Sequence, residues 1–141
     1  MRAIRAGIVY FMLVFITGFA FGIARTLLLA HYPELDRFTA VLLELPGVLG
    51  VSWLICRFLV RRMKVPEGLS ARASMGAVAF ILLIIAEAVL DIALSGESIG
   101  DHFAHYREPA YVLGLAGQVA FSLMPLFAGL GGADSRPRPA R

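Results

Sequence analysis

The sequence of 141 residues contains one cysteine, one tryptophan and few charged side chains, which make up 16% of the chain. The lone cysteine, Cys56, excludes a disulfide within the chain, and its apolar neighbours indicate a small packing residue. The H-E-x-x-H motif typical of zinc hydrolases does not occur. Ser52 and Ser122 lie in apolar runs that hold no histidine to activate them, so the sequence argues against an enzyme.

Apolar residues, in contrast, are abundant. They make up 59% of the chain and give a mean hydropathy of +0.78, which indicates an integral membrane protein. A helix needs about 20 apolar residues to cross a bilayer. Four runs meet this length, which predicts an all-α four-helix bundle within residues 1–130. The expected spans are residues 7–29, 39–60, 71–94 and 110–130.

The net charge of +3 comes from basic residues in short segments between the apolar runs. This distribution argues against nucleic-acid binding and fits membrane topology. Because arginine and lysine gather before the first span, between spans two and three and after span four, both termini are expected in the cytoplasm. Arginine far outnumbers lysine, which is typical of a GC-rich bacterium, so the expected location is a bacterial inner membrane. Residues 131–141 predict a disordered cytoplasmic tail. The first apolar run is longer than a signal-peptide core, so we interpret it as a span.

The loop between spans three and four predicts a short amphipathic helix at residues 98–108, lying on the outer membrane face. Ser98 and Asp101 fit a capping box, and Pro109 supplies a stop. The polar side of this predicted helix is most simply interpreted as a face in contact with water. The same side also offers a possible site for a divalent metal. The candidate ligands are Asp101, His102, His105 and Glu108. We predict no other cofactor.

Three local features bear on how the helices pack. Gly18 and Gly22 form a GxxxG motif, which favours close helix approach within the chain or in a dimer. The second helix is expected to continue through Pro46, since a start after this residue leaves too few residues to span. Ser70 is a plausible N-cap for the third helix.

Ionisable and amide side chains interrupt all four spans. Arg25, Glu44 and Asp91 fall roughly 5 to 8 Å inside the outer boundary, and Glu87 and Gln118 lie about 10 Å deep. A charge near the middle of a span costs about 2.5 to 3.5 kcal/mol, so these residues are expected to face inward and pair in one polar cluster. Arg37 is placed to reach the cluster from the outer loop.

Short motifs give the chain a resemblance to a group of small four-span bacterial inner-membrane proteins that are themselves uncharacterised. The motifs are residues 18–25, Glu44-Leu45-Pro46, Arg61-Arg62, Ala86-Glu87 and Met124-Pro125. The resemblance covers nearly the whole chain and implies the four-span architecture without an activity.

Two functions follow from the polar cluster. In the first, the cluster fixes helix register in a structural or accessory subunit that packs in the bilayer as a homodimer or within a larger complex. In the alternative, the carboxylates of span three, Glu87 and Asp91, serve a small proton- or cation-coupled transporter or channel.

Overall fold

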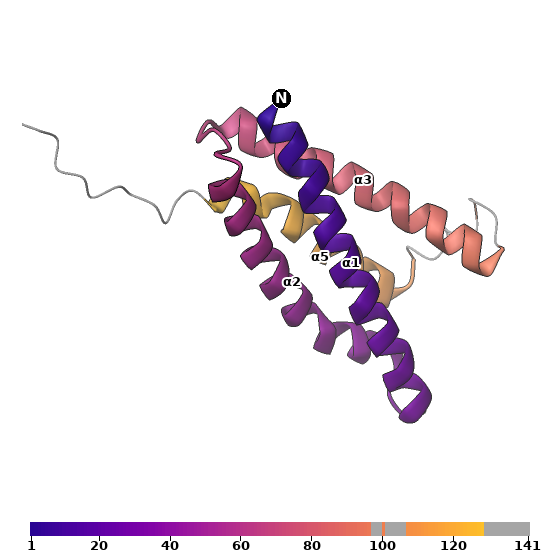
Figure 1. Ribbon diagram of the computed structural model, residues 1–141. Coiled ribbons are helices and arrows are strands. Elements are labelled where there is room, and N and C mark those ends of the chain that lie inside the picture. The colour runs from indigo at the N-terminus through magenta and orange to yellow at the C-terminus, as the bar shows by residue number, and fades with distance from the viewer. Residues whose placement is uncertain (97–99, 101–106, 129–141) are drawn as a thin grey trace, which may run out of the picture.

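The computed structural model describes residues 1–96, 100 and 107–128, which form four long helices (Figure 1). Their bounds are α1 Arg2–His31, α2 Arg37–Arg62, α3 Leu69–Ser95 and α5 Pro109–Phe127. Each is long and apolar enough to cross a membrane, so the prediction of an all-α protein with four apolar helices is confirmed. Apart from residues 100, 107 and 108, the predicted outer helix lies outside the described residues, as does the predicted tail.

Helix α2 begins where the Asp36 carboxylate caps it. Asp36 Oδ1 accepts a hydrogen bond from the Thr39 backbone N–H at 3.0 Å, and Oδ2 accepts one from the Thr39 hydroxyl at 2.5 Å. These donors stabilise the ionised form, so they lower the pKa of Asp36, with the hydroxyl making the larger contribution. As predicted, α2 then continues through Pro46, although proline has no N–H to donate to the Leu42 carbonyl.

Helix α3 begins differently from what the sequence suggests. Gly68, with an extended backbone, is the N-cap of α3, so the prediction for Ser70 is wrong. A serine hydroxyl caps a helix only where its own backbone is still extended, whereas Ser70 is already helical and its carbonyl accepts a bond from the Ser74 hydroxyl. Pro109, expected to stop the outer helix, is the first residue of α5, where a missing N–H costs nothing.

The four helices form a ring in which each packs against two others. Helix α1 lies against α2 and α3, and α5 lies against the same two helices, so α1 and α5 occupy one diagonal. The helices converge beside the N-terminus and spread toward the opposite end, where α3 points away from α1 and α2 (Figure 1). We call the converging end the packed half and the spreading end the open half.

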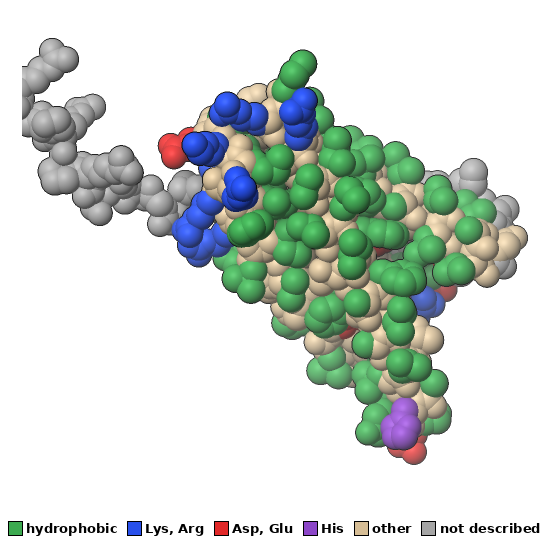
Figure 2. Space-filling view, viewed as in Figure 1, with side chains coloured by type: hydrophobic (Ala, Val, Ile, Leu, Met, Phe, Trp, Pro, Cys, Tyr) green, Lys and Arg blue, Asp and Glu red, His purple; other side chains and the backbone are tan. Residues whose placement is uncertain are grey.

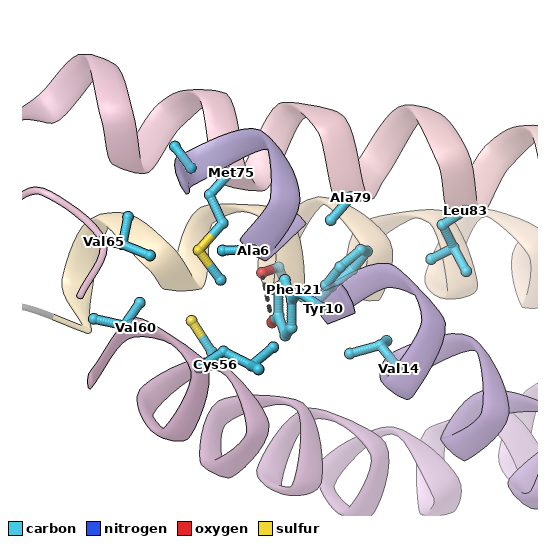
Figure 3. Packing of buried hydrophobic residues seen from close by; sticks show 12 residues of the cluster. Ala6, Tyr10, Val14, Cys56, Val60, Val65, Met75, Ala79, Leu83 and Phe121 are labelled. Carbon is cyan, nitrogen blue, oxygen red and sulfur yellow. Dashed lines mark hydrogen bonds between the residues drawn. The ribbon is translucent and has the colours of Figure 1, made fainter. Parts of the chain in front are cut away.

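The hydrophobic core lies in the packed half (Figure 3). It is built from the N-terminal turns of α1 and α3 and the C-terminal turns of α2 and α5. Tyr10, Cys56 and Met75 are fully buried there, and Phe121 is almost so. The interpretation of Cys56 as a small packing residue is confirmed, since it lies among these apolar side chains.

A hydrogen bond crosses the diagonal of the ring at Tyr10. Its hydroxyl donates to the Phe121 carbonyl at 3.1 Å, and the two rings pack with centroids 5.4 Å apart. This carbonyl lacks its helical donor, because residue 125, four positions later, is proline. A side chain of α1 thus satisfies a backbone acceptor that Pro125 leaves open in α5, as apolar surroundings require.

Close helix approach depends on Gly7 and Gly76. A Cβ at Gly76 would lie 2.0 Å from the Ser122 carbonyl oxygen of α5, and one at Gly7 would lie 2.7 Å from the Met75 carbonyl oxygen of α3. Both obstacles are backbone atoms, which cannot rotate away as a side chain can. Glycine at these positions therefore sets the spacing of α3 against α5 and of α1 against α3.

Basic side chains gather at the end of the packed half, around the N-terminus and the connection between α2 and α3 (Figure 2). Between the two ends, the surface visible in Figure 2 is mostly apolar. Arg72 differs from the other basic residues because it is buried, and its guanidinium donates to the Pro66 carbonyl at 3.0 Å and the Pro125 carbonyl at 3.3 Å. It therefore joins the α2–α3 connection to α5 and does not lie free in the loop.

Candidate functional site

The open half contains a cavity of about 670 Å³ that is lined by side chains from all four helices. Each helix contributes one face, at spacings of three or four residues that bring side chains to the same side of a helix. On α2, for example, Glu44, Val48 and Ser52 line the cavity at intervals of four. Phe121 also lines it, so this residue belongs both to the core of the packed half and to the cavity wall.

An ion pair joins α1 to α2 at this cavity. Arg25 Nη1 lies 2.7 Å from Glu44 Oε2, and the two side chains are 28% and 14% exposed. The pair lies where Pro46, half a turn further along α2, removes one backbone hydrogen bond. A charge-assisted contact at this distance is stronger than a neutral hydrogen bond, so it stabilises the packing of α1 against α2 within the open half.

A second polar pair joins α5 to α3. Gln118 Nε2 donates to Glu87 Oε2, which leaves Gln118 Oε1 to face elsewhere. This orientation of the amide is the one that chemistry requires, because a carboxylate repels the amide oxygen and attracts its N–H groups. Gln118 Oε1 is buried, and no donor within the described part of the chain reaches it.

Ser52 carries another buried polar atom on the cavity wall. Its side chain is fully buried, and within residues 1–96, 100 and 107–128 no hydrogen-bond partner lies near Oγ. A buried hydroxyl without a partner is costly, and in a native protein such an atom commonly meets a bound water or ion. Ser52 and Gln118 therefore place two hydrogen-bonding oxygens at the cavity.

Arg37 and Tyr111 form a third contact, between the N-terminal ends of α2 and α5. Arg37 Nη2 donates to the Tyr111 hydroxyl at 3.2 Å, and the guanidinium carbon lies 4.7 Å from the centre of the tyrosine ring. Both residues line the cavity, as does Asp91 of α3. Arg37 is thus the first residue of α2 and does not extend from a loop.

The structure brings all five residues of the predicted polar cluster to one cavity. Two pairs are in direct contact, Arg25 with Glu44 and Glu87 with Gln118. Sequence reasoning did not find the contributions of Ser52 and Tyr111. The helical period could have indicated both residues. Ser52 lies eight residues after Glu44, and Tyr111 lies seven residues before Gln118, so each is on the same side of its helix as that polar residue.

The GxxxG glycines line this cavity and make no close helix contact within the part of the chain that the structure describes. A Cβ at Gly18 would meet nothing within 4 Å, and one at Gly22 would meet only the side chain of Arg25, on the same helix, at 3.7 Å. Both glycines line the cavity. Small residues at these positions therefore leave space between the helices.

Most of the candidate metal ligands lie outside the described residues, namely Asp101, His102 and His105. Glu108 is described and is the N-cap of α5. Among the residues that the structure describes, no three histidine, cysteine, aspartate or glutamate side chains come together as a metal site would require. The outer-loop metal site stays a prediction.

Comparison of the chain with protein-family models, with curated proteins and with solved structures finds no match. Carboxylates, guanidinium groups, an amide and hydroxyls around an apolar space can recognise a solute by charge and by hydrogen bonding.

Proposed function

We propose that the protein is a small multi-pass transporter of a bacterial inner membrane and that it binds a small amphipathic solute in its open half. The arrangement of the helices then corresponds to a state in which this half opens to the outside of the cell. Both termini then lie in the cytoplasm. The orientation is supported by the basic residues at the packed end, since arginine and lysine in short loops favour the cytoplasmic side. The resemblance to small four-span inner-membrane proteins agrees with this architecture.

The main support for this proposal is the cavity that surrounds the polar residues. A cluster that only fixed helix register would be expected to sit among tightly packed side chains, as the core of the packed half does. Instead, the polar groups line a cavity of about 670 Å³. This volume lies within the range of about 300 to 1,000 Å³ that is typical of sites for small molecules.

An accessory or structural subunit is the second candidate, and the Arg25–Glu44 pair favours it. This ion pair joins two helices directly and needs no ligand to do so. A subunit of a larger complex should co-purify with a stoichiometric partner after gentle extraction. Isolation as a solitary, monodisperse protein would count against this candidate.

Labelling of engineered cysteines tests the binding cavity. In a Cys56→Ala background, Gly114→Cys places a thiol on the cavity wall, where a Cβ meets no atom within 4 Å. Gly50→Cys is the matched control, because Gly50 is equally unobstructed but lies on an exposed face of α2 that does not line the cavity. We expect a membrane-impermeant methanethiosulfonate reagent, added outside intact cells, to modify Gly114→Cys and to leave Gly50→Cys in lipid unmodified.

Two results would contradict the proposal. If Gly114→Cys does not react in the folded protein even after the membrane is permeabilised, water and solutes do not enter the cavity, and the structural role is favoured. If it reacts only after permeabilisation, the open half faces the cytoplasm, and the proposed orientation is wrong.

A further inference from the structure

We infer that the packed half binds the phosphate group of an anionic phospholipid on the face of α2 that points away from the core. This inference rests on the proposed membrane location, and it does not depend on the solute cavity, which lies in the other half. Three observations lead to it: a groove on α2, the arginines that line it, and the order of charged and apolar side chains along it.

The groove has a volume of about 540 Å³ and lies along the last turns of α2. Five side chains line it, all from this helix, and we call it the basic groove: Leu54, Arg57, Phe58, Arg61 and Arg62. Their spacing of three or four residues places them on one face. Cys56 and Leu59, on the opposite face, are buried in the core. The basic groove therefore faces the surroundings of the bundle.

The three arginines of the basic groove differ from the arginines inside the bundle in lacking a partner. Arg25 pairs with a carboxylate, Arg37 with a hydroxyl and Arg72 with two backbone carbonyls. For the arginines of the groove, no ion pair or side-chain hydrogen bond occurs within residues 1–96, 100 and 107–128. The sequence also has no acidic residue between Glu44 and Glu67. The groove thus presents three positive charges that an anion would balance.

Charged and apolar side chains follow one another along the groove in the order found in a phospholipid. Arg61 and Arg62 lie at the end of α2. Arg57 and Phe58 lie about one turn further in, and Leu54 lies about two turns in. Phe58 and Leu54 are 62% and 67% exposed, so their apolar surface is open to lipid. A phosphate at the helix end would leave its acyl chains lying along these two side chains.

Arg57 gives the groove a stronger need for an anion than the helix end alone would have. It lies about 7 Å further in than Arg62 along the axis and is half-buried. Its guanidinium has to extend toward the headgroups to reach water, as long basic side chains near the ends of membrane helices do. A phosphate that accepts two parallel hydrogen bonds from a guanidinium would satisfy it at that level.

The occupant that matches both ends of the groove is an anionic phospholipid. A free phosphate would leave the apolar end uncovered, whereas acyl chains would bury it. A zwitterionic lipid brings its own ammonium group next to three guanidinium groups, which weakens its binding by charge repulsion. Basic clusters at the cytoplasmic ends of spans attract anionic lipids, so the proposed orientation agrees with this choice.

Trp53, the single tryptophan of the chain, provides a reporter beside the basic groove. It lies one turn before Arg57, and its side chain is partly exposed. Along the axis it is about 13 Å from Arg62, which is the level of the middle of an acyl chain whose phosphate lies at the helix end. A lipid that carries bromine in the middle of its acyl chains should therefore quench the fluorescence of Trp53 by contact.

Competition between two lipids tests the inference. The purified chain is reconstituted in mixed vesicles of phosphatidylglycerol and phosphatidylcholine, with bromine on one lipid or the other. The two quenching curves give the ratio of the binding constants at Trp53. We expect phosphatidylglycerol to be favoured about fivefold or more. Equal quenching by the two lipids at equal content would overturn the inference.

Two triple variants assign the preference to the groove. With Arg57→Gln, Arg61→Gln and Arg62→Gln combined, the ratio should fall to about one. The matched control, with Arg2→Gln, Arg5→Gln and Lys64→Gln, removes three positive charges outside the groove and should keep the preference. An equal loss in both variants would show a general effect of charge and contradict the groove.

Arg61→Gln alone keeps the test decisive if the triple variant of the groove folds poorly. Arg61 is exposed and has no partner in the described part of the chain, so its loss should leave the fold intact. The ratio should fall about twofold. An unchanged ratio in this variant would contradict the role of the arginines.

The results separate this inference from the proposed function. If neither brominated lipid quenches Trp53, α2 does not lie in the bilayer, and the proposed membrane location is wrong. If both lipids quench equally, the location stands and the lipid site is wrong. If sodium phosphate lowers the preference more than sodium chloride of equal ionic strength does, the groove binds a free phosphate, and the lipid is the wrong occupant.

Discussion

The packed half and the open half are built from the same four helices, yet they differ in almost every physical respect. In the packed half, fully buried side chains such as Tyr10 and Met75 fill the space between helices, and Gly7 and Gly76 let backbones approach closely. In the open half, polar residues line a cavity, and a Cβ at Gly18 would touch nothing. Gly7 and Gly76 thus allow close packing at one end, whereas Gly18 leaves space at the other.

This difference teaches how a short chain of four apolar helices can hold both a fold and a polar site. In a bilayer the apolar effect does not press helices together, so association relies on close packing and on hydrogen bonds between helices. The packed half supplies both. Polar residues in the open half are consequently less constrained by the need to hold the bundle together.

The largest expected effect comes from closing the gap between α3 and α5. Gly76→Ala forces a methyl group against the Ser122 carbonyl, so we expect the free energy of unfolding in detergent to fall by about 3 kcal/mol. Gly114→Ala, in the open half, should instead be neutral or stabilising by up to about 1 kcal/mol, because alanine favours a helix. Equal destabilisation of the two variants would break the contrast between the halves.

The next effect concerns the diagonal bond. Tyr10→Phe leaves the Phe121 carbonyl without a donor and should lower the free energy of unfolding by about 1 to 2 kcal/mol. Pro125→Ala restores a backbone N–H for this carbonyl. In a double-mutant cycle, Tyr10→Phe should therefore cost less in the Pro125→Ala background, and additive effects would show that the two residues do not share this acceptor.

In the open half, loss of the Arg25–Glu44 pair should cost less than loss of the Tyr10 bond. Arg25→Gln or Glu44→Gln alone is expected to lower the free energy of unfolding by about 1 kcal/mol, because the partner keeps some access to the cavity. The double variant should recover part of this loss, since no unpaired charge remains. If either single change destabilises the protein more than Tyr10→Phe does, the open half is a main source of stability.

The smallest effect is expected at Asp36, which is fully exposed. Its lowered pKa means that its capping contribution is complete above the ordinary value of 3.8 and is lost as pH falls through the lowered pKa. Asp36→Ser keeps a capping oxygen that does not titrate, so the wild type should unfold at a higher temperature than this variant near neutral pH. The difference should shrink in acid, and a constant difference would show that the carboxylate charge contributes nothing.

Hydropathy alone was enough to predict the four long apolar helices of the described residues. The depth of each polar residue, counted along its span, also predicted that Arg25, Glu44, Glu87, Asp91 and Gln118 lie at one level. Both predictions depend only on distance along a helix, which the rise per residue determines.

Which of these residues contact each other could not be predicted from the sequence. Lipid-facing and core-facing positions are both apolar in a membrane helix, so hydropathy does not say which face meets which neighbour. For this reason the contact of Arg25 with Glu44 and the role of Tyr10 could not be foreseen. The presence of Pro125 did imply an unsatisfied carbonyl at Phe121, but not the residue that would reach it.

Phe121 belongs both to the core of the packed half and to the cavity wall, so it connects the two halves of the molecule. Its side chain forms part of the cavity wall, while its ring and carbonyl both contact Tyr10. A solute that shifts this residue must also disturb the diagonal hydrogen bond or move α1 with α5. Occupancy of the cavity and the separation of two helices that are not neighbours in the ring are therefore mechanically linked through a single side chain.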